Sequence, residues 1–167
     1  MQPDTILILL VIFLQISYND SNSETFSNSE RKESKIMKFI TIGELLMRLS
    51  PPDYEKIRTT SSYVVNFGGA EANVAVSLAN LGVDTTVFTV LPDNDIGRSA
   101  VRSLKANDVH TSPIIFGGER MGVYFLEEGI GVRSSKVIYD RKHSAFAEYD
   151  YTTVDFKALL EAMTGFT

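Results

Sequence analysis

Apolar and polar residues change their spacing several times along the chain, and each change marks an expected element. Alternating or continuous apolar runs, typical of strands, occupy residues 39–43, 63–67, 84–90, 109–116, 122–126 and 136–141. Residues 45–49 alternate less clearly and are expected to form a lid or edge strand that ends at Pro51-Pro52. Helical spacing follows the paired glycines 68–69. It reappears after the turn at residues 91–95 and continues to about residue 107, and it returns over residues 151–163. Strands that alternate with helices predict an α/β fold built on a doubly wound sheet.

The segment 63–82 reads as a strand, a two-glycine turn and a helix. The residues expected on the inward face of this helix are Val74, Leu78 and Leu81, with Ala75 and Ala79 beside them. Gly82 stands where the end of a helix favours a residue with positive φ.

The two later helices carry their own start signals. Asp93 or Asp95 is expected to cap the second helix. Its expected inward residues are Ile96, Ala100, Val101 and Leu104. The third helix is expected to start near Tyr151, with Thr152 and Asp155 as a capping box and Tyr151 packed on Phe156.

The runs 122–126 and 136–141 predict a long β-hairpin with one solvated face. Tyr139 and Arg141 are two residues apart on one strand and share a face, as do Gly122 and Tyr124 on the other. Tyrosines offer hydroxyls and a flat apolar body, and arginine offers a planar two-pronged cation. Together with Asn73 beside the glycine turn, these groups would suit a polyol acid. The alternatives are cross-strand packing of the tyrosines and a solvated arginine.

The glycine turn has its own two interpretations. Backbone N–H groups at the start of a helix attract oxygen acceptors or negative charge, and glycine lets a ligand approach them closely. A tight turn without a ligand explains the same residues.

Composition excludes several classes of protein. The chain has 167 residues, 44% of them hydrophobic and 22% charged, which suits one globular domain. A net charge of −5 argues against a nucleic-acid partner. The sequence contains no cysteine, and His110 and His143 are isolated, so no metal site of the His/Cys type is expected.

Residues 1–36 differ from the rest and are expected to be a disordered or leader-like extension. Ile6 to Ile16 is apolar but shorter than the ~20 residues that cross a bilayer, and the segment 19–35 is rich in Ser, Asn, Glu and Lys. Three interpretations remain open: a mis-annotated extension, a real leader or anchor, and a structured addition. The first predicts a cytoplasmic protein, and the second a membrane-associated or secreted one.

Several motifs in order resemble one family. Gly-Gly-Ala-Glu-Ala-Asn-Val-Ala at 68–75, Leu-Gly at 81–82 and Leu-Pro-Asp-Asn-Asp-Ile-Gly at 91–97 resemble the N-terminal signature of the PfkB (ribokinase-like) sugar kinases. The glutamate at position 71 is most similar to the 2-keto-3-deoxygluconate kinase branch. The resemblance covers residues 37–167 and implies a ribokinase-like, Rossmann-like doubly wound sheet with a small β lid that covers the sugar.

The resemblance also implies a site. The residues at the family's substrate-binding positions are Gly69, Ala70, Glu71, Ala72, Asn73, Tyr124, Tyr139 and Arg141. Glu71 is read as mainly structural, because its charge favours the helix N-terminus. Members of the family often have an acidic residue near the position of Glu44 that binds sugar hydroxyls. A solvated loop glutamate is at least an equal alternative for Glu44.

The family uses ATP and Mg²⁺, and its catalytic aspartate lies in a Gly-Ala-Gly-Asp type segment. Nothing after Arg141 matches that segment, and no GxxxxGK[ST] loop occurs. The resemblance therefore implies the N-terminal, sugar-binding part of an ATP-dependent 2-keto-3-deoxygluconate kinase, truncated at its C-terminus. Such a chain is expected to have no catalytic or metal-binding residues of its own, to bind ATP and Mg²⁺ poorly and to be inactive alone. The alternatives are part of a fructokinase or ribokinase, and a non-catalytic sugar-binding protein that forms homodimers through its lid.

Overall fold

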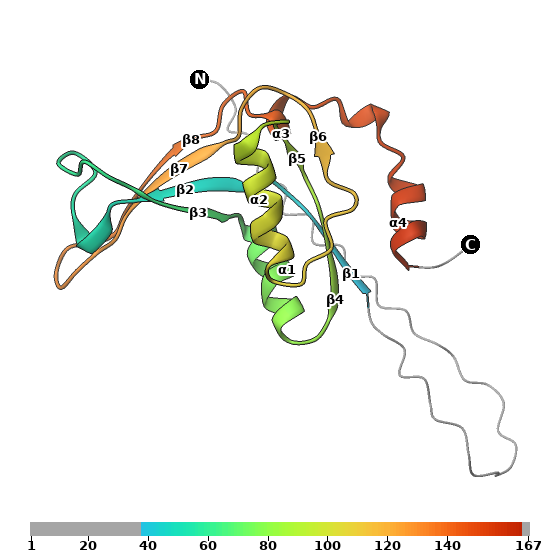
Figure 1. Cartoon of the computed structure of the whole chain (residues 1–167), viewed down its shortest axis with the longest axis horizontal. Coiled ribbons are helices and arrows are strands. Elements are labelled where there is room, and N and C mark those ends of the chain that lie inside the picture. Colours follow the sequence, from blue (N-terminus) through green and yellow to red (C-terminus); the bar gives the residue numbers. More distant parts are fainter. Residues whose placement is uncertain (1–37, 165–167) are drawn as a thin grey trace, which may run out of the picture.

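The computed structural model describes residues 38–164 and contains eight strands and four helices in that range (Figure 1). The strands are β1 (Lys38–Ile42), β2 (Leu46–Ser50), β3 (Val64–Gly68), β4 (Asp84–Phe88), β5 (Val90–Leu91), β6 (Ile115–Phe116), β7 (Val123–Glu127) and β8 (Lys136–Asp140). The helices are α1 (Ala70–Asn80), α2 (Asp95–Lys105), α3 (Ala145–Glu148) and α4 (Phe156–Thr164), with 3₁₀ turns at Pro52–Tyr54 and Tyr151–Thr153. The leader-like segment 1–36 lies outside the described residues.

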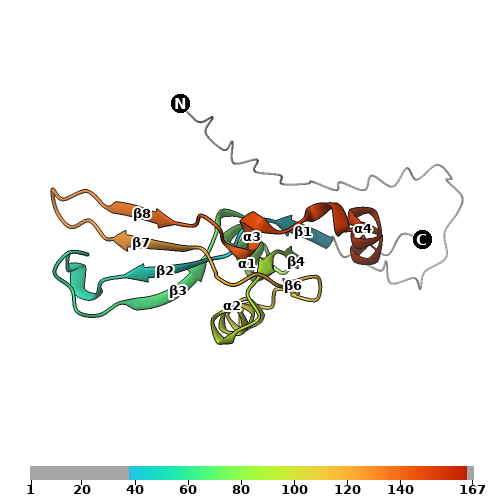
Figure 2. The same cartoon turned by 90° about the horizontal axis from the view of Figure 1, so that it is seen from above.

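The strands form two regions with different roles. β1 pairs in parallel with β4, and β5 pairs in parallel with β6. The other four strands form a separate sheet in the order β3-β2-β7-β8, which extends away from the helices (Figures 1 and 2). This second sheet is called the lid below. Parallel strands that pack against α1 and, through Phe88, against Phe156 of α4, together with the lid, agree with the expected α/β architecture.

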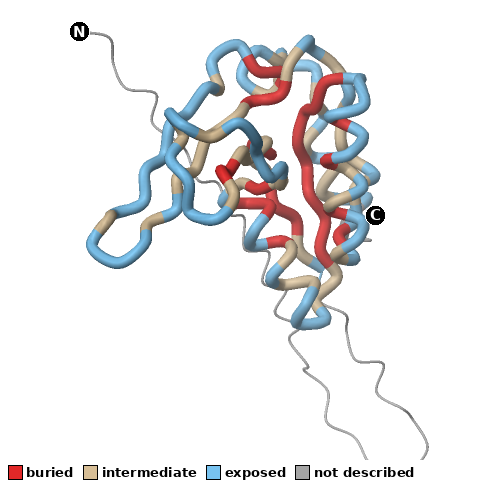
Figure 3. Tube along the Cα trace, turned by 60° about the vertical axis from the view of Figure 1, so that its left-hand side comes forward, coloured by how far each residue is buried: buried red, intermediate tan, exposed pale blue. Residues whose placement is uncertain are grey.

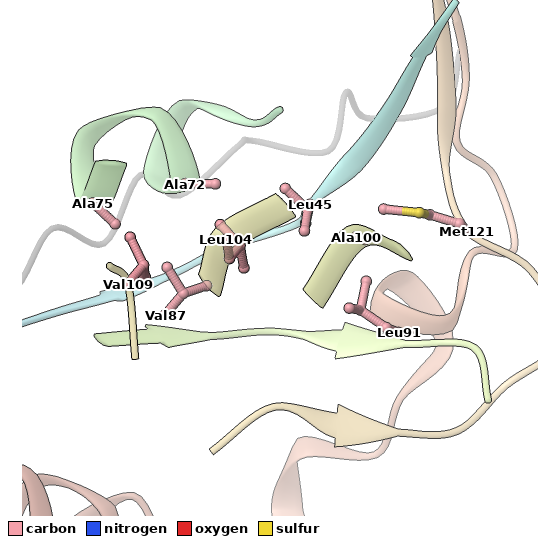
Figure 4. Close-up of a cluster of buried hydrophobic side chains, with 9 residues drawn as sticks. All are labelled: Leu45, Ala72, Ala75, Val87, Leu91, Ala100, Leu104, Val109 and Met121. Atoms are coloured by element: carbon pink, nitrogen blue, oxygen red, sulfur yellow. The ribbon is translucent and has the colours of Figure 1, made fainter. Parts of the chain in front are cut away.

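The core lies between α1, α2 and the β4–β5 segment (Figure 4). Its buried residues are Leu45, Ala72, Ala75, Val87, Leu91, Ala100, Leu104, Val109 and Met121. Leu45 and Met121 precede β2 and β7 respectively, so the core reaches the base of the lid. Burial is concentrated there, whereas most of the lid is exposed or half-buried (Figure 3).

Two expected strands have different boundaries in the structure. The run 84–90 is divided into β4 and β5 at Thr89. The continuous strand expected over 109–116 is wrong: His110 makes a single bridge to Thr86, and only β6 follows. Between them Ile114 donates to the carbonyl of Thr111 in a turn that contains Pro113, which has no N–H to donate to a ladder.

The lid strands occur where expected but differ in their pairing. β3 joins the lid antiparallel to β2, while β7 and β8 form the expected antiparallel hairpin. β2 lies between β3 and β7, so it is a lid strand but not an edge strand.

The glycine turn and helix are confirmed, but the inward face of α1 is not the expected one. Ala72 and Ala75 are buried, whereas Val74 is 37% and Leu81 78% exposed. Val76 and Ala79 complete the face that contacts the core. The small alanines let α1 approach the sheet closely, and they therefore decide the face in place of the larger residues. Gly82 has φ +80°, as the helix end requires.

The start signals of the later helices also needed correction. Asn94, not an aspartate, caps α2 by accepting from the backbone N–H groups of Ile96 and Gly97. Ala100 and Leu104 are buried as expected, but Ile96 is 43% exposed.

At the C-terminal end, α4 starts at Phe156 and the Asp155 carboxylate accepts from the N–H of Ala158. Tyr151 packs on Phe146 and Tyr149, while Phe156 packs on Phe88, so the expected contact between Tyr151 and Phe156 is wrong. In the described part of the chain, none of the helices has the length and apolar character needed to cross a bilayer.

The corrected face of α1 makes a testable prediction. Ala75→Leu should lower the free energy of unfolding by about 1–3 kcal/mol, because Ala75 is fully buried in the core and has no space for extra methylenes. Val74→Ala, one residue away, should change it by less than about 0.5 kcal/mol. Urea unfolding measures both. Equal losses in the two variants would contradict the observed face.

Candidate functional site

The expected site residues lie where β1 ends, α1 begins and the lid joins the core. In open α/β sheets ligands bind outside the carboxyl ends of the strands, and Gly43-Glu44 follows directly after β1. The Gly68-Gly69 turn comes from the end of β3, and Arg141 follows β8. Segments about 100 residues apart in sequence therefore meet at one place.

A close approach of two backbone segments requires glycine at position 69. A Cβ at this position would lie 2.4 Å from the carbonyl oxygen of Glu44, so the loop after β1 touches the turn before α1. The backbone of Gly69 is extended, and its carbonyl accepts from the N–H of Asn73 in the first turn of α1. The close approach that explains this glycine is therefore made by the protein backbone.

Asn73, Gly68 and Tyr124 form one group. A Cβ built on Gly68 would lie 3.4 Å from Asn73 Oδ1 and 3.7 Å from the Tyr124 hydroxyl. Asn73 is exposed and Tyr124 half-buried. An amide and a phenol therefore flank a residue without a side chain, which is an arrangement able to hydrogen-bond hydroxyl groups.

Tyr124 and Tyr139 are direct partners across β7 and β8. Their ring centroids are 5.8 Å apart with a tilt of 35°. The cross-strand packing that the sequence left as an alternative therefore exists, and Tyr139 remains 62% exposed. Ring packing of this kind does not exclude a ligand, because the hydroxyls and outer faces remain accessible.

Arg141 is engaged by a buried carboxylate. Its Nη2 forms an ion pair with Glu44 Oε2, and the other oxygen of Glu44 accepts a hydrogen bond from the Ser144 hydroxyl at 2.6 Å. The Glu44 side chain is only 4% exposed, compared with 36% for Arg141. Glu44 is therefore not a solvated loop residue. It connects the end of β1 to the lid and to the start of α3, where Ser144 is the N-cap.

Gly122 provides the space for this contact. A Cβ there would lie 2.5 Å from Glu44 Oε1 and 3.2 Å from the Cβ of Arg141. The carboxylate of Glu44 therefore rests on the backbone at the start of β7.

The remaining expected residues have different surroundings. Glu71 is 7% exposed, and its carboxyl group lies over Gly43, where a Cβ would come within 2.4 Å of Glu71 Oε2. Its position in the first turn of α1 agrees with stabilisation by the helix N-terminus. The side chain of Ala72 lies in the core, and Ala70 is exposed.

Sequence reasoning missed Ser144, the buried state of Glu44 and the space that Gly122 leaves for it. Only the capping preference of serine gave a signal for Ser144. Tyr151, whose hydroxyl donates to the Phe146 carbonyl, lies close enough to Glu44 to be influenced by its charge. Burial raises the pKa of Tyr151 well above its ordinary value, and the negative charge of Glu44 raises it further.

The two histidines serve other contacts. His110 Nε2 lies 2.9 Å from Asp84 Oδ1, and His143 contacts Glu148. Over residues 38–164, no group of three or more His, Cys, Asp or Glu side chains is arranged to hold a metal ion. A hollow of about 300 Å³ borders Gly68 and Asn73 between α1 and α2, with Ser77, Ser103 and Asn107 among its polar lining residues.

Comparison with known proteins gives consistent matches. The model of the family described as pfkB family carbohydrate kinase matches residues 37–163. A 2-dehydro-3-deoxygalactonokinase of Haloferax volcanii is 38% identical over 106 residues, which are 64% of this chain and 33% of that protein. A 5-dehydro-2-deoxygluconokinase of Geobacillus kaustophilus is 32% identical over 98 residues, covering 57% of this chain and 29% of the relative.

Among solved structures, the chain is similar to the 2-dehydro-3-deoxygluconokinase of Thermotoga maritima. The TM-score is 0.73 and the identity 47%, with 75% of this chain and 38% of that chain covered. The chain thus spans about a third of the length of the curated relatives that it matches.

Proposed function

Because this chain belongs to the pfkB family of carbohydrate kinases, we propose that it is the sugar-binding part of a kinase for a 2-keto-3-deoxygluconate-type sugar acid. The whole protein would transfer a phosphoryl group from ATP to the terminal hydroxyl of the sugar acid. The names of the relatives support this class, because all three refer to dehydro-deoxy derivatives of gluconate or galactonate. They differ in the sugar acid named, so the proposal extends to the class and not to one stereoisomer.

The observation that carries the proposal is the convergence of complementary groups on one face of the lid and the adjacent turn. Asn73 and the Tyr124 hydroxyl flank Gly68, and Tyr139 lies beside Tyr124. Amide and phenol groups suit sugar hydroxyls, and the tyrosine rings suit the carbon chain. Arg141 stands two residues beyond Tyr139. Its Nη2 is paired with Glu44, while the rest of the guanidinium fork has donors left for a carboxylate.

Arg141 separates a sugar acid from a neutral sugar as substrate. In Arg141→Ala, the affinity for 2-keto-3-deoxygluconate should fall at least about tenfold, because a charge-assisted hydrogen bond is lost. The affinity for fructose should change less. Isothermal titration calorimetry on the 167-residue chain measures both. The variant Arg141→Lys retains a partner for the buried Glu44 and therefore distinguishes loss of recognition from loss of fold.

The sugar-acid assignment is wrong if Arg141→Lys lowers the affinities for the sugar acid and for fructose equally. It is also wrong if Arg141→Ala leaves the affinity for the sugar acid unchanged. Part of a fructokinase or ribokinase then becomes the better interpretation.

In the whole kinase, sugar binding and phosphoryl transfer would depend on different segments of the chain. ATP and Mg²⁺ are the family's co-substrate and metal ion, and phosphoryl transfer needs a nucleotide cradle and a group that orients the attacking hydroxyl. This chain contains no Gly-Ala-Gly-Asp type segment after Arg141. A coupled assay of ADP release should therefore find no sugar-dependent ATP turnover by this chain alone. Sugar-dependent turnover above that of a heat-inactivated sample would refute this part.

A second candidate, a protein that forms homodimers through its lid, is favoured by the other face of that sheet. Val65, Leu49, Phe125 and Ile138 are neighbours in register across all four strands. Val65 is 52% and Ile138 40% exposed. An apolar row of this kind on a sheet surface is typical of an interaction surface.

Light scattering should give a dimer mass for the wild-type chain, and Ile138→Lys should give a monomer, because a charge would interrupt the apolar row. The matched control is Leu81→Lys at the C-cap of α1, which changes an apolar residue that is 78% exposed and outside the lid. A monomeric wild type, with and without the sugar acid, would contradict lid-mediated dimers.

A further inference from the structure

A chemical difficulty follows from the Glu44–Arg141 pair. If the substrate is a sugar acid, its carboxylate needs positive charge, but the charge of Arg141 is already offset by Glu44. Glu71, which is also buried, adds a further negative charge near the start of α1. An anion would bind weakly here without another cation.

Arg48, in the middle of β2, lies on the face of the lid that carries Tyr124 and Tyr139. In register it is the partner of Asn66 on β3 and of Tyr124 on β7, and Tyr124 in turn opposes Tyr139 on β8. Partners across adjacent strands project to the same side of a sheet. The row Asn66–Arg48–Tyr124–Tyr139 therefore crosses the whole lid on the face that also holds Gly68.

The neighbours of Arg48 along β2 face the opposite way. Met47 packs against the hydrophobic core, as does Phe67, its partner on β3. The core and the arginine thus occupy opposite faces of the lid, as strand alternation requires.

Within residues 38–164, Arg48 has no ion pair, and its Nε is buried without a hydrogen-bond acceptor. The other lid arginines use their terminal nitrogens: Arg141 Nη2 pairs with Glu44, and Arg133 Nη2 donates to the backbone carbonyls of Tyr54 and Glu128. Arg133 Nε, like Arg48 Nε, is buried without an acceptor among the described residues, so Arg48 differs in that its terminal nitrogens are also uncommitted there. A buried donor without a partner is unfavourable, and such a group in a folded protein calls for an explanation. A bound anion would supply the missing acceptor.

We propose that Arg48 is a specificity-determining residue that binds the carboxylate of the sugar acid from the lid, alongside Arg141. This inference rests on the proposed function. Arg48 supplies the uncompensated charge and a planar pair of donors, which fit the two oxygens of a carboxylate. Arg141 is held in place by Glu44, so it orients the carboxylate of the sugar acid but adds little net positive charge. Tyr124, between the two in the sheet, places its ring beside the carbon chain.

The test compares the affinities of the 167-residue chain for 2-keto-3-deoxygluconate and for the neutral ketose fructose. In Arg48→Met, which keeps the length of the side chain but removes its charge, affinity for the acid should fall at least about tenfold. Affinity for fructose should change less than about twofold. Arg48→Lys should restore part of the preference, because the charge returns without the planar fork. The matched control is Arg58→Met, an exposed residue of the β2–β3 connection, which should leave the preference unchanged.

The stability of Arg48→Met gives a second readout. Because it removes a buried donor that has no partner, the urea midpoint should stay equal or rise, whereas a purely structural arginine would lower it. If Arg48→Met fails to fold, the wild-type chain still provides a test. The ¹⁵Nε resonance of Arg48 should shift when the sugar acid is added and stay in place with fructose.

The outcomes separate the two claims. A wild-type chain that binds neither sugar, or does not prefer the acid, overturns the proposed function and this inference with it. A wild-type chain that prefers the acid, with the preference unchanged in Arg48→Met, overturns the role of Arg48 alone. The same holds if the Arg48 resonance does not respond to the acid.

Discussion

The arrangement of the candidate site depends on one buried carboxylate. Glu44 is almost fully removed from water, and an ion in that position is tolerated only when it is paired and hydrogen-bonded. Arg141 and Ser144 provide those partners, and Gly122 provides the space. Since these residues come from the segment after β8, the start of α3 and the start of β7, one side chain fixes where the lid meets the core.

The two faces of the lid carry residues of different character. One face carries Asn66, Arg48, Tyr124 and Tyr139, and the other carries Val65, Leu49, Phe125 and Ile138. The two rows use the same positions of the same four strands, displaced by one residue. Strand alternation therefore separates a polar, aromatic surface suited to a sugar acid from an apolar surface suited to a protein partner.

Local signals in the sequence were enough for most strands, for α1, α2 and α4, and for the hairpin and the glycine turn, but not for α3 or for the segment 109–116. They failed where tertiary packing outweighed them. The size of Val74 and Leu81 suggested the inner face of α1, but close contact with the sheet favours Ala72 and Ala75. Family motifs named Tyr124, Tyr139 and Arg141 as candidates. No local pattern reveals that Glu44 engages Arg141 or that Arg48 lacks a partner, because both facts depend on segments that lie far apart in the sequence.

The pairing of β2 with β7 has a consequence for the order of folding. Each lid hairpin is closed by a local connection, residues 51–63 or 128–135, whereas the pairing of β2 with β7 joins residues 47–49 to residues 123–125. The entropy of closing so long a loop must be offset before the β2–β7 pairing contributes, so non-local parallel pairing is slow. The core formed by α1, α2 and β4 lies between these two segments in sequence, and its assembly shortens that loop. The lid is therefore expected to be the last part of the molecule to acquire its native structure, and its two hairpins can exist before they are joined.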